Sequence, residues 1–196
     1  NHYRFDVHTQ QVLQKVRFKL ANISKVRPFM SQDRAKLVVE ALVHSVINYM
    51  GIIYLRLPSN KTKVQKLLNR APRLVLRAEP RSHVEDLLRE LYWLNVENMQ
   101  RYAMITSLRR LKYRRCKAMI SWSNLFAGRQ RLYKLRSVHL RVQWPKIMAH
   151  GRNSYLYQAS YLYNEFEMNG AHFRSENEFK IRAKFQVFKT FSNGNL

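Results

Sequence analysis

Apolar residues recur every three or four positions along most of the first 110 residues, and this spacing constrains the fold more than any other feature of the sequence. Between residues 8 and 27 the recurring residues are Val12, Val16, Leu20 and Ile23. Apolar side chains at this spacing lie on one face of a helix, and that face must pack against another element. The pattern therefore predicts a series of amphipathic helices that pack as a bundle.

Residues that favour helix ends divide the bundle into separate helices. Asp6, Ser31 and Asn95 are each expected to cap a helix, because their side-chain oxygens can accept a backbone N–H that has no partner in the first turn. Ser-His-Val-Glu at residues 82–85 and Ser-Glu-Asn-Glu at residues 175–178 have the capping-box spacing. Two further helices are therefore expected to begin there.

Two internal helices carry broad apolar faces. The second helix is expected to follow Ser31 and to end near Gly51, and Pro72 is expected to kink or divide the third, because proline cannot donate a helical hydrogen bond. The apolar face of the second helix is predicted to consist of Ala35, Val38, Leu42, Val46 and Ile47, and that of the third of Val64, Leu67, Leu68, Ala71 and Leu74. Trp93 and His44 are expected in the core.

The pattern changes between residues 125 and 170. Short alternating runs and the turn residues Pro145 and Gly151 predict an irregular segment with two short strands. Tyrosines at positions 155, 157, 161 and 163 are spaced for one face of a strand, and a platform for stacking bases is the alternative. Aromatic residues between 179 and 191 predict a closing helix.

The expected fold is thus mainly α: a helical bundle, an irregular segment with short strands, and a C-terminal helix. We expect two domains, a helical domain over residues 1–120 and a basic C-terminal region over residues 121–196.

The chain is strongly basic. It has 36 Lys and Arg against 12 Asp and Glu, which gives a formal charge of +24 and a pI of about 10.7. Nucleic acid is the partner this charge favours, because each neutralised phosphate releases counterions whatever the base sequence. A merely solvated basic surface, an anionic membrane surface and an acidic protein are the alternatives.

The positive charge is concentrated between residues 98 and 164, where 14 Lys and Arg and no acidic residue occur. Aromatic residues are mixed with the basic ones at residues 113–122 and 133–163, which suits phosphate neutralisation combined with base stacking. The residues expected to contact phosphates are Arg70, Arg73, Arg110, Arg114, Lys117, Arg131, Lys134, Arg136 and Arg141.

Catalytic patterns are missing from the sequence. A two-metal site needs closely paired carboxylates, but there are only three aspartates and the one adjacent acidic pair, Glu85 and Asp86, is expected at the start of a helix. The sequence has no phosphate-binding glycine loop, metalloprotease motif or serine elbow. Cys116 is the only cysteine, and no apolar stretch is long enough to span a membrane. We expect no cofactor and no bound metal.

Taken in order, several segments resemble the thumb and C-terminal region of LINE-type (non-LTR, jockey-like) retrotransposon reverse transcriptases. The similar segments are residues 5–8, 26–30, 35–37, 64–71, 87–94, 135–145, 151–155, 163–164 and 179–191. The sequence departs from the family pattern at Pro72, at Tyr163 and at residues 165–166.

The resemblance implies a thumb-like helical domain that grips RNA or an RNA–DNA duplex. It also implies a parent protein with RNA-directed DNA polymerase activity, whose catalytic aspartates would precede Asn1. Three hypotheses follow: a nucleic-acid-binding module, a structural subunit of a ribonucleoprotein derived from a retrotransposon fragment, and a fragment of an active polymerase. A nuclear or cytoplasmic ribonucleoprotein is the expected location, with other protein subunits as further partners.

Overall fold

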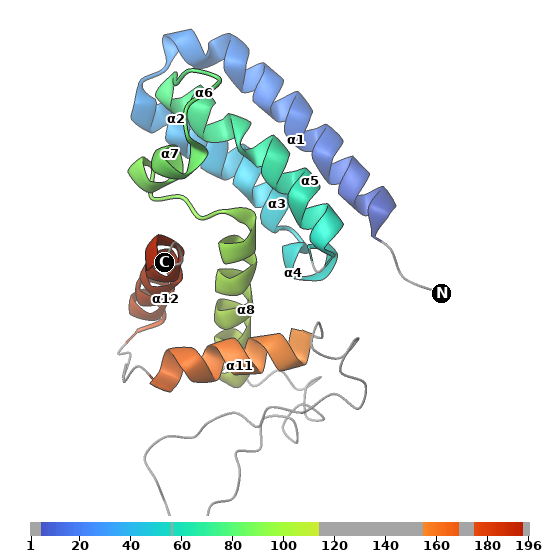
Figure 1. Cartoon of the computed structure of the whole chain (residues 1–196), viewed down its shortest axis with the longest axis vertical. Coiled ribbons are helices and arrows are strands. Elements are labelled where there is room, and N and C mark those ends of the chain that lie inside the picture. Colours follow the sequence, from blue (N-terminus) through green and yellow to red (C-terminus); the bar gives the residue numbers. More distant parts are fainter. Residues whose placement is uncertain (1–4, 56, 114–154, 169–174, 194–196) are drawn as a thin grey trace, which may run out of the picture. The chain divides into compact units, whose positions relative to one another are not determined.

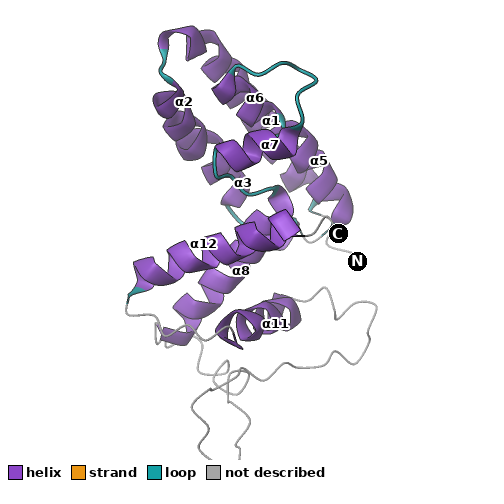
Figure 2. Ribbon diagram, turned by 60° about the vertical axis from the view of Figure 1, so that its left-hand side comes forward, coloured by secondary structure: helices purple, strands orange, loops and turns teal. Residues whose placement is uncertain are grey.

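The computed structural model describes residues 5–55, 57–113, 155–168 and 175–193, and these segments are mainly α-helical. Figure 2 shows helices joined by loops and turns, and no strand occurs within these segments. The predicted mainly α fold is confirmed. The short strands predicted between residues 125 and 154 lie outside the described residues.

The chain divides into two compact units, Asn1–Gln100 (unit 1) and Arg101–Leu196 (unit 2). The predicted domain boundary after residue 120 lies outside the described residues. Unit 1 contains α1 (Asp6–Val26), η1 (a 3-10 turn, Arg27–Phe29), α2 (Gln32–Val39), η2 (a π-helical turn, Glu40–His44), α3 (Ser45–Asn48), α4 (Gly51–Tyr54), α5 (Pro58–Leu68), α6 (Arg70–Leu76) and α7 (Val84–Glu90). Helix α8 (Val96–Tyr113) begins in unit 1 and continues into unit 2, which also contains α11 (Tyr155–Met168) and α12 (Glu176–Asn193).

Helix α1 forms where the apolar spacing predicts it. Val12, Val16, Leu20 and Ile23 are all buried, and α1 lies alongside α5 (Figure 1). The predicted cap is wrong, because Asp6 is the first residue of the helix itself and no side chain caps it. In that position the carboxylate instead interacts with the positive end of the helix dipole.

The second predicted helix exists, and Ala35 and Ile47 of its predicted apolar face are buried, but the face between them is shifted. Ser31 caps it as predicted, accepting a hydrogen bond from the Arg34 N–H at 3.4 Å. Leu42, expected in the core, is 42% exposed, whereas the buried residues recur every four positions at Ala35, Val39, Val43 and Ile47. The π-helical turn η2 accounts for the change at Leu42 and Val43, because its i→i+5 hydrogen bonds widen the turn and rotate the side chains within and after it.

A buried arginine joins the end of α1 to the end of α6. Arg27 is 6% exposed, and its guanidinium donates to the carbonyls of Leu74 (3.1 Å), Val75 (2.6 Å) and Met30 (2.7 Å). Helix C-termini carry partial negative charge on such carbonyls. Burial, and then the nearby charge of Arg77, lower the pKa of Arg27 from its ordinary value. The C-terminus of α6 therefore holds a buried cation without a carboxylate.

Arg77 completes this junction from the other side. It ends α6 in the left-handed conformation (φ 53°), and its Nη2 donates to the carbonyls of Arg27 (3.3 Å) and Pro28 (3.2 Å). The two arginines thus make reciprocal bonds between α6 and the turn after α1.

The loop before α8 is anchored by Trp93, whose buried ring contacts two polar side chains. Trp93 is 2% exposed; its indole N–H donates to Glu40 Oε1 at 2.6 Å, and the His44 ring contacts it edge-on at 4.5 Å. Trp93 and His44 are therefore core residues, as predicted. Asn95 caps α8 as predicted, its Oδ1 accepting from the Asn98 N–H at 2.8 Å.

The other predicted helix ends have mixed outcomes. The helix that contains Pro72 divides at Asn69 into α5 and α6, and Pro72 lies in the first turn of α6, where its missing N–H costs nothing. The prediction that Ser82 begins a capping box is wrong, because α7 begins two residues later without a side-chain cap. At Ser175 the prediction is confirmed: its Oγ accepts from the Glu178 N–H at 3.1 Å, directly before α12.

The irregular structure and strand-like tyrosines predicted between residues 155 and 168 are wrong, because this segment is helix α11. Ala159, Tyr163 and Phe166 are buried and recur at helical spacing, whereas Tyr161 is 57% exposed. The segment contains no glycine, proline or β-branched residue, so nothing in it opposes a helix. Tyrosine spacing alone was misleading.

We predict that Arg27→Met lowers the free energy of unfolding by about 2–3 kcal/mol, because buried carbonyls lose their charged donor while the apolar stem is kept. Urea unfolding measures the loss. Arg17→Met, at an exposed position on α1, is the control and should change stability by less than about 0.5 kcal/mol. Equal effects of the two substitutions would refute the structural role of Arg27.

Candidate nucleic-acid interface

Three exposed cations form a line along α5 and the start of α6. Lys63, Lys66 and Arg70 are spaced three and four residues apart, so they share a helix face, and we refer to them as the α5 stripe. Leu68 is buried on the opposite side, and Val64 is buried on the flank between them. Core packing therefore fixes the helix and leaves the α5 stripe exposed to solvent.

The α5 stripe lies in a part of the sequence without carboxylates. No Asp or Glu occurs between Glu40 and Glu79. Within the described part of the chain, the three cations have no ion-pair partner. Helix α1, which packs against α5, adds exposed Lys15 and Lys25 and contains no acid after Asp6. Apart from Asp6, these two helices therefore contain no acidic residue to offset their positive charge.

Arg73 continues the same helix face but has a different role. Its Nη2 donates to the Ser82 carbonyl at 3.1 Å and its Nη1 is 3.4 Å from the Asn69 carbonyl. The side chain is half-buried. Arg73 therefore links α6 to the loop that precedes α7, and fewer of its donors face solvent than those of Arg70.

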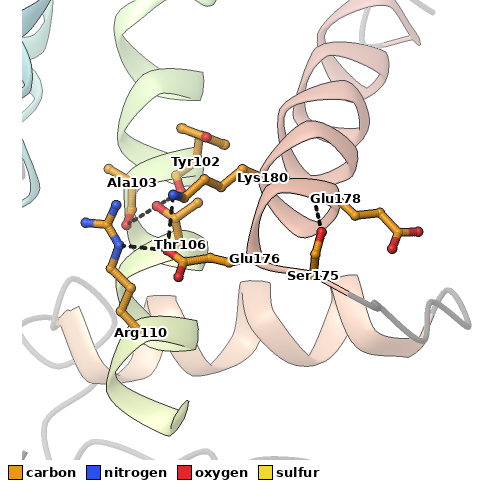
Figure 3. A network of polar contacts seen from close by, with 8 residues as sticks. All are labelled: Tyr102, Ala103, Thr106, Arg110, Ser175, Glu176, Glu178 and Lys180. Carbon is orange, nitrogen blue, oxygen red and sulfur yellow. Dashed lines mark hydrogen bonds and ion pairs between the residues drawn. The ribbon is translucent and has the colours of Figure 1, made fainter. Parts of the chain in front are cut away.

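In unit 2, Arg110 takes part in an ion-pair network between α8 and α12. Its Nε lies 3.6 Å from Glu176 Oε1, and Lys180 Nζ lies 3.1 Å from the same oxygen. Figure 3 shows both cations directed at this carboxylate, with Thr106 of α8 close by. The three charged side chains are 56%, 33% and 46% exposed for Arg110, Lys180 and Glu176, so the network is accessible from solvent.

Tyr102 lies one turn before Thr106 in the same region of α8 (Figure 3). Burial raises the pKa of Tyr102, while the Arg110 charge opposes that rise. Its hydroxyl therefore stays protonated at neutral pH and can donate a hydrogen bond to an acceptor such as a phosphate oxygen.

An aromatic cluster holds the helices of unit 2 together. Phe179 of α12 is 1% exposed and contacts Phe166 edge-on, with centroids 5.1 Å apart, and Tyr163 at 6.4 Å. The guanidinium of Arg109 lies over the Phe179 ring at 4.1 Å. This cluster fixes the position from which Arg110, the next residue of α8, reaches Glu176.

The predicted phosphate contacts fall into two groups. Arg70 and Arg73 lie in unit 1 and Arg110 in unit 2. The remaining six lie outside the described residues: Arg114, Lys117, Arg131, Lys134, Arg136 and Arg141. Lys63, Lys66 and Lys180 were missed as candidates. The spacing of Lys63 and Lys66 from Arg70 could have identified them, but nothing local distinguishes Lys180.

Within the described segments no group of three His, Cys, Asp or Glu could hold a metal ion. Glu85 and Asp86 lie in the first turn of α7, as predicted, and Asp86 pairs with His83 (3.4 Å) and Arg89 (3.9 Å). Among the helices of these segments, none is both long and apolar enough to cross a membrane.

No protein-family model matches the chain, and neither curated proteins nor solved structures give a match. Any functional assignment therefore depends on the charges and geometry of the chain itself and on the order of motifs in its sequence.

We predict that Phe179→Ala destabilises unit 2 by about 3–4 kcal/mol, because it removes a buried ring from between three helices. Thermal unfolding and amide hydrogen exchange in α11 measure the effect. Phe185→Ala is the matched control, since this phenylalanine of α12 is 58% exposed and should contribute less than about 1 kcal/mol. A comparable loss from both would rule out the Phe179 cluster as the core of unit 2.

Proposed function

We propose that the chain is a non-catalytic, nucleic-acid-binding part of a reverse-transcriptase-like protein, and that it holds RNA or an RNA–DNA duplex by the phosphate backbone. The α5 stripe carries the proposal: three aligned, exposed cations without a carboxylate partner in the described residues. The resemblance to the thumb of non-LTR reverse transcriptases supports the choice of RNA and RNA–DNA duplexes.

Backbone recognition is the mode that this chemistry favours. Lysine presents a compact ammonium charge and arginine a planar guanidinium with several N–H donors. Both bind phosphate oxygens without regard to base sequence. A line of such residues can follow one strand of a duplex. The proposed contacts are Lys63, Lys66, Arg70 and Arg110, together with the six predicted cations outside the described residues.

A salt titration with a matched pair of double variants tests the proposal. Affinity for a labelled RNA–DNA hybrid should fall steeply as salt rises from about 50 to about 200 mM. Lys66→Gln/Arg70→Gln should make the slope of log affinity against log salt shallower by about 1.4–1.8, since each lost contact contributes about 0.7–0.9. Fluorescence anisotropy gives both affinity and slope.

The control is Arg34→Gln/Lys36→Gln, on α2 of the same unit and next to Asp33. It removes the same net charge and should leave the slope nearly unchanged. Wild-type binding that ignores ionic strength contradicts the proposed function. Equal effects of the two double variants contradict the role of the α5 stripe.

A structural role in a ribonucleoprotein is the second candidate, and an exposed apolar group favours it. Tyr49 (68% exposed), Met50 (44%), Ile53 (39%) and Leu57 (37%) lie within nine residues of one another around α4. Exposed apolar residues that form a contiguous patch often mark contacts between proteins.

For the scaffolding role we predict that Tyr49→Ser/Ile53→Ser prevents incorporation into a larger particle, while affinity for an isolated duplex stays within about twofold of wild type, because the α5 stripe is untouched. Sedimentation of the particle and anisotropy with the duplex measure the two effects. Normal incorporation of the double variant would exclude this surface from assembly.

A further inference from the structure

Two cations from different helices converge on a single oxygen atom in unit 2. Arg110 of α8 and Lys180 of α12 approach Glu176 Oε1 to 3.6 and 3.1 Å (Figure 3). One negative charge therefore faces two positive charges, and this cluster keeps a net positive charge. The position of Oε1 is a point at which an anionic oxygen is attracted from two directions.

The contact between Arg110 and the Glu176 carboxylate is loose. The distance from Arg110 Nε to the carboxylate exceeds hydrogen-bond length. The guanidinium and the carboxylate therefore do not form a bidentate pair with two parallel N–H···O bonds. All three side chains are at least one-third exposed. Ion pairs of this exposed kind contribute little to stability, so exchanging one anion for another costs little.

A phosphodiester suits the same position better than the carboxylate does. Its two non-bridging oxygens can accept hydrogen bonds separately, one from the arginine guanidinium and one from the lysine ammonium. A phosphate from solvent can also adjust its position freely, whereas the Glu176 carboxylate is attached to α12. Tyr102 and Thr106 of α8 lie on the same side of the network (Figure 3), and their side chains are half-buried.

We propose that Arg110 and Lys180 form a binding site for a backbone phosphate of the nucleic acid, and that the carboxylate of Glu176 occupies this site in the free protein as an internal competitor. The inference rests on the proposed function and adds to it one ligand position, one new cation and a residue that weakens binding. Its distinctive consequence is that removing a charged residue strengthens binding.

The experiment compares Glu176→Gln with Glu178→Gln in the full chain. Glu178 is also in the first turn of α12 and also pairs with a cation, Arg182 at 3.0 Å. Both substitutions remove one negative charge from the same helix end, so they share any effect of net charge or helix dipole. Anisotropy with a labelled RNA–DNA hybrid at several salt concentrations gives the affinities, and thermal unfolding verifies that each variant is folded.

Glu176→Gln should tighten binding about twofold to fivefold near 100 mM salt, the range expected from releasing exposed ion pairs. Its salt dependence should steepen by about 0.7–1.8, for one or two additional phosphate contacts. Glu178→Gln should change affinity by less than about 1.5-fold, well below the effect of releasing an ion pair at the site. In an Arg110→Gln/Lys180→Gln background, Glu176→Gln should have no further effect, because the site it blocks is gone.

The outcomes separate the two proposals. Wild-type binding without salt dependence overturns the proposed function itself. Salt-dependent binding with equal effects of Glu176→Gln and Glu178→Gln, or a gain that persists without Arg110 and Lys180, overturns the phosphate site alone.

A variant with the opposite expected sign covers the case in which Glu176→Gln is unfolded. Lys180→Gln should weaken binding and flatten the salt dependence relative to Lys184→Gln, an exposed lysine one turn further along α12. Identical behaviour of these two lysine variants also overturns the phosphate site.

Discussion

The bonds from Arg27 to backbone carbonyls are the contacts on which the arrangement of unit 1 depends. They connect the end of α1 to the last turn of α6, two elements almost fifty residues apart in the sequence. A chain with three times as many bases as acids has few carboxylates to place inside. Because the C-terminus of α6 supplies the negative charge that faces Arg27, no carboxylate is needed there. The paired helices α1 and α5 can therefore remain almost free of acidic residues.

The same shortage of carboxylates determines how unit 2 is built. Arg109 is placed over an aromatic ring, and Arg110 and Lys180 share one carboxylate. Ring faces and shared anions stabilise a cation less completely than a dedicated ion pair in a buried site does. Both units thus fold with positive charge that is only partly compensated, and the proposed binding of nucleic acid depends on this incomplete compensation.

Periodicity and capping residues predicted much of the fold. The apolar spacing of Val12 to Ile23 predicted α1, and Ser175 correctly marked the start of α12. The failures have local causes: a π-helical turn rotated the buried face around Leu42, and the tyrosines near α11 suggested a strand although Ala159 and Phe166 follow helical spacing. Hydropathy patterns contain no information about a change in helix type.

Charge patterns located part of the candidate site but not its geometry. Arg70 and Arg110 were predicted as phosphate contacts and are exposed, whereas Arg73 donates to the Ser82 carbonyl. The convergence of Lys180 on Glu176 beside Arg110 depends on how two helices pack, so spacing along the chain could not predict it. Contacts between distant segments are the information that periodicity lacks.

Arg77 shows how tertiary bonds limit attempts to improve this protein by local rules. Engineering for stability would replace this left-handed residue at the end of α6 by glycine, which relieves about 1 kcal/mol of backbone strain. Here the strained conformation carries the guanidinium to the carbonyls of Arg27 and Pro28. A glycine would relax the turn but would also remove the side chain that holds this segment. At this position the consensus rule for helix ends therefore predicts a gain in stability where the tertiary bonds indicate a loss.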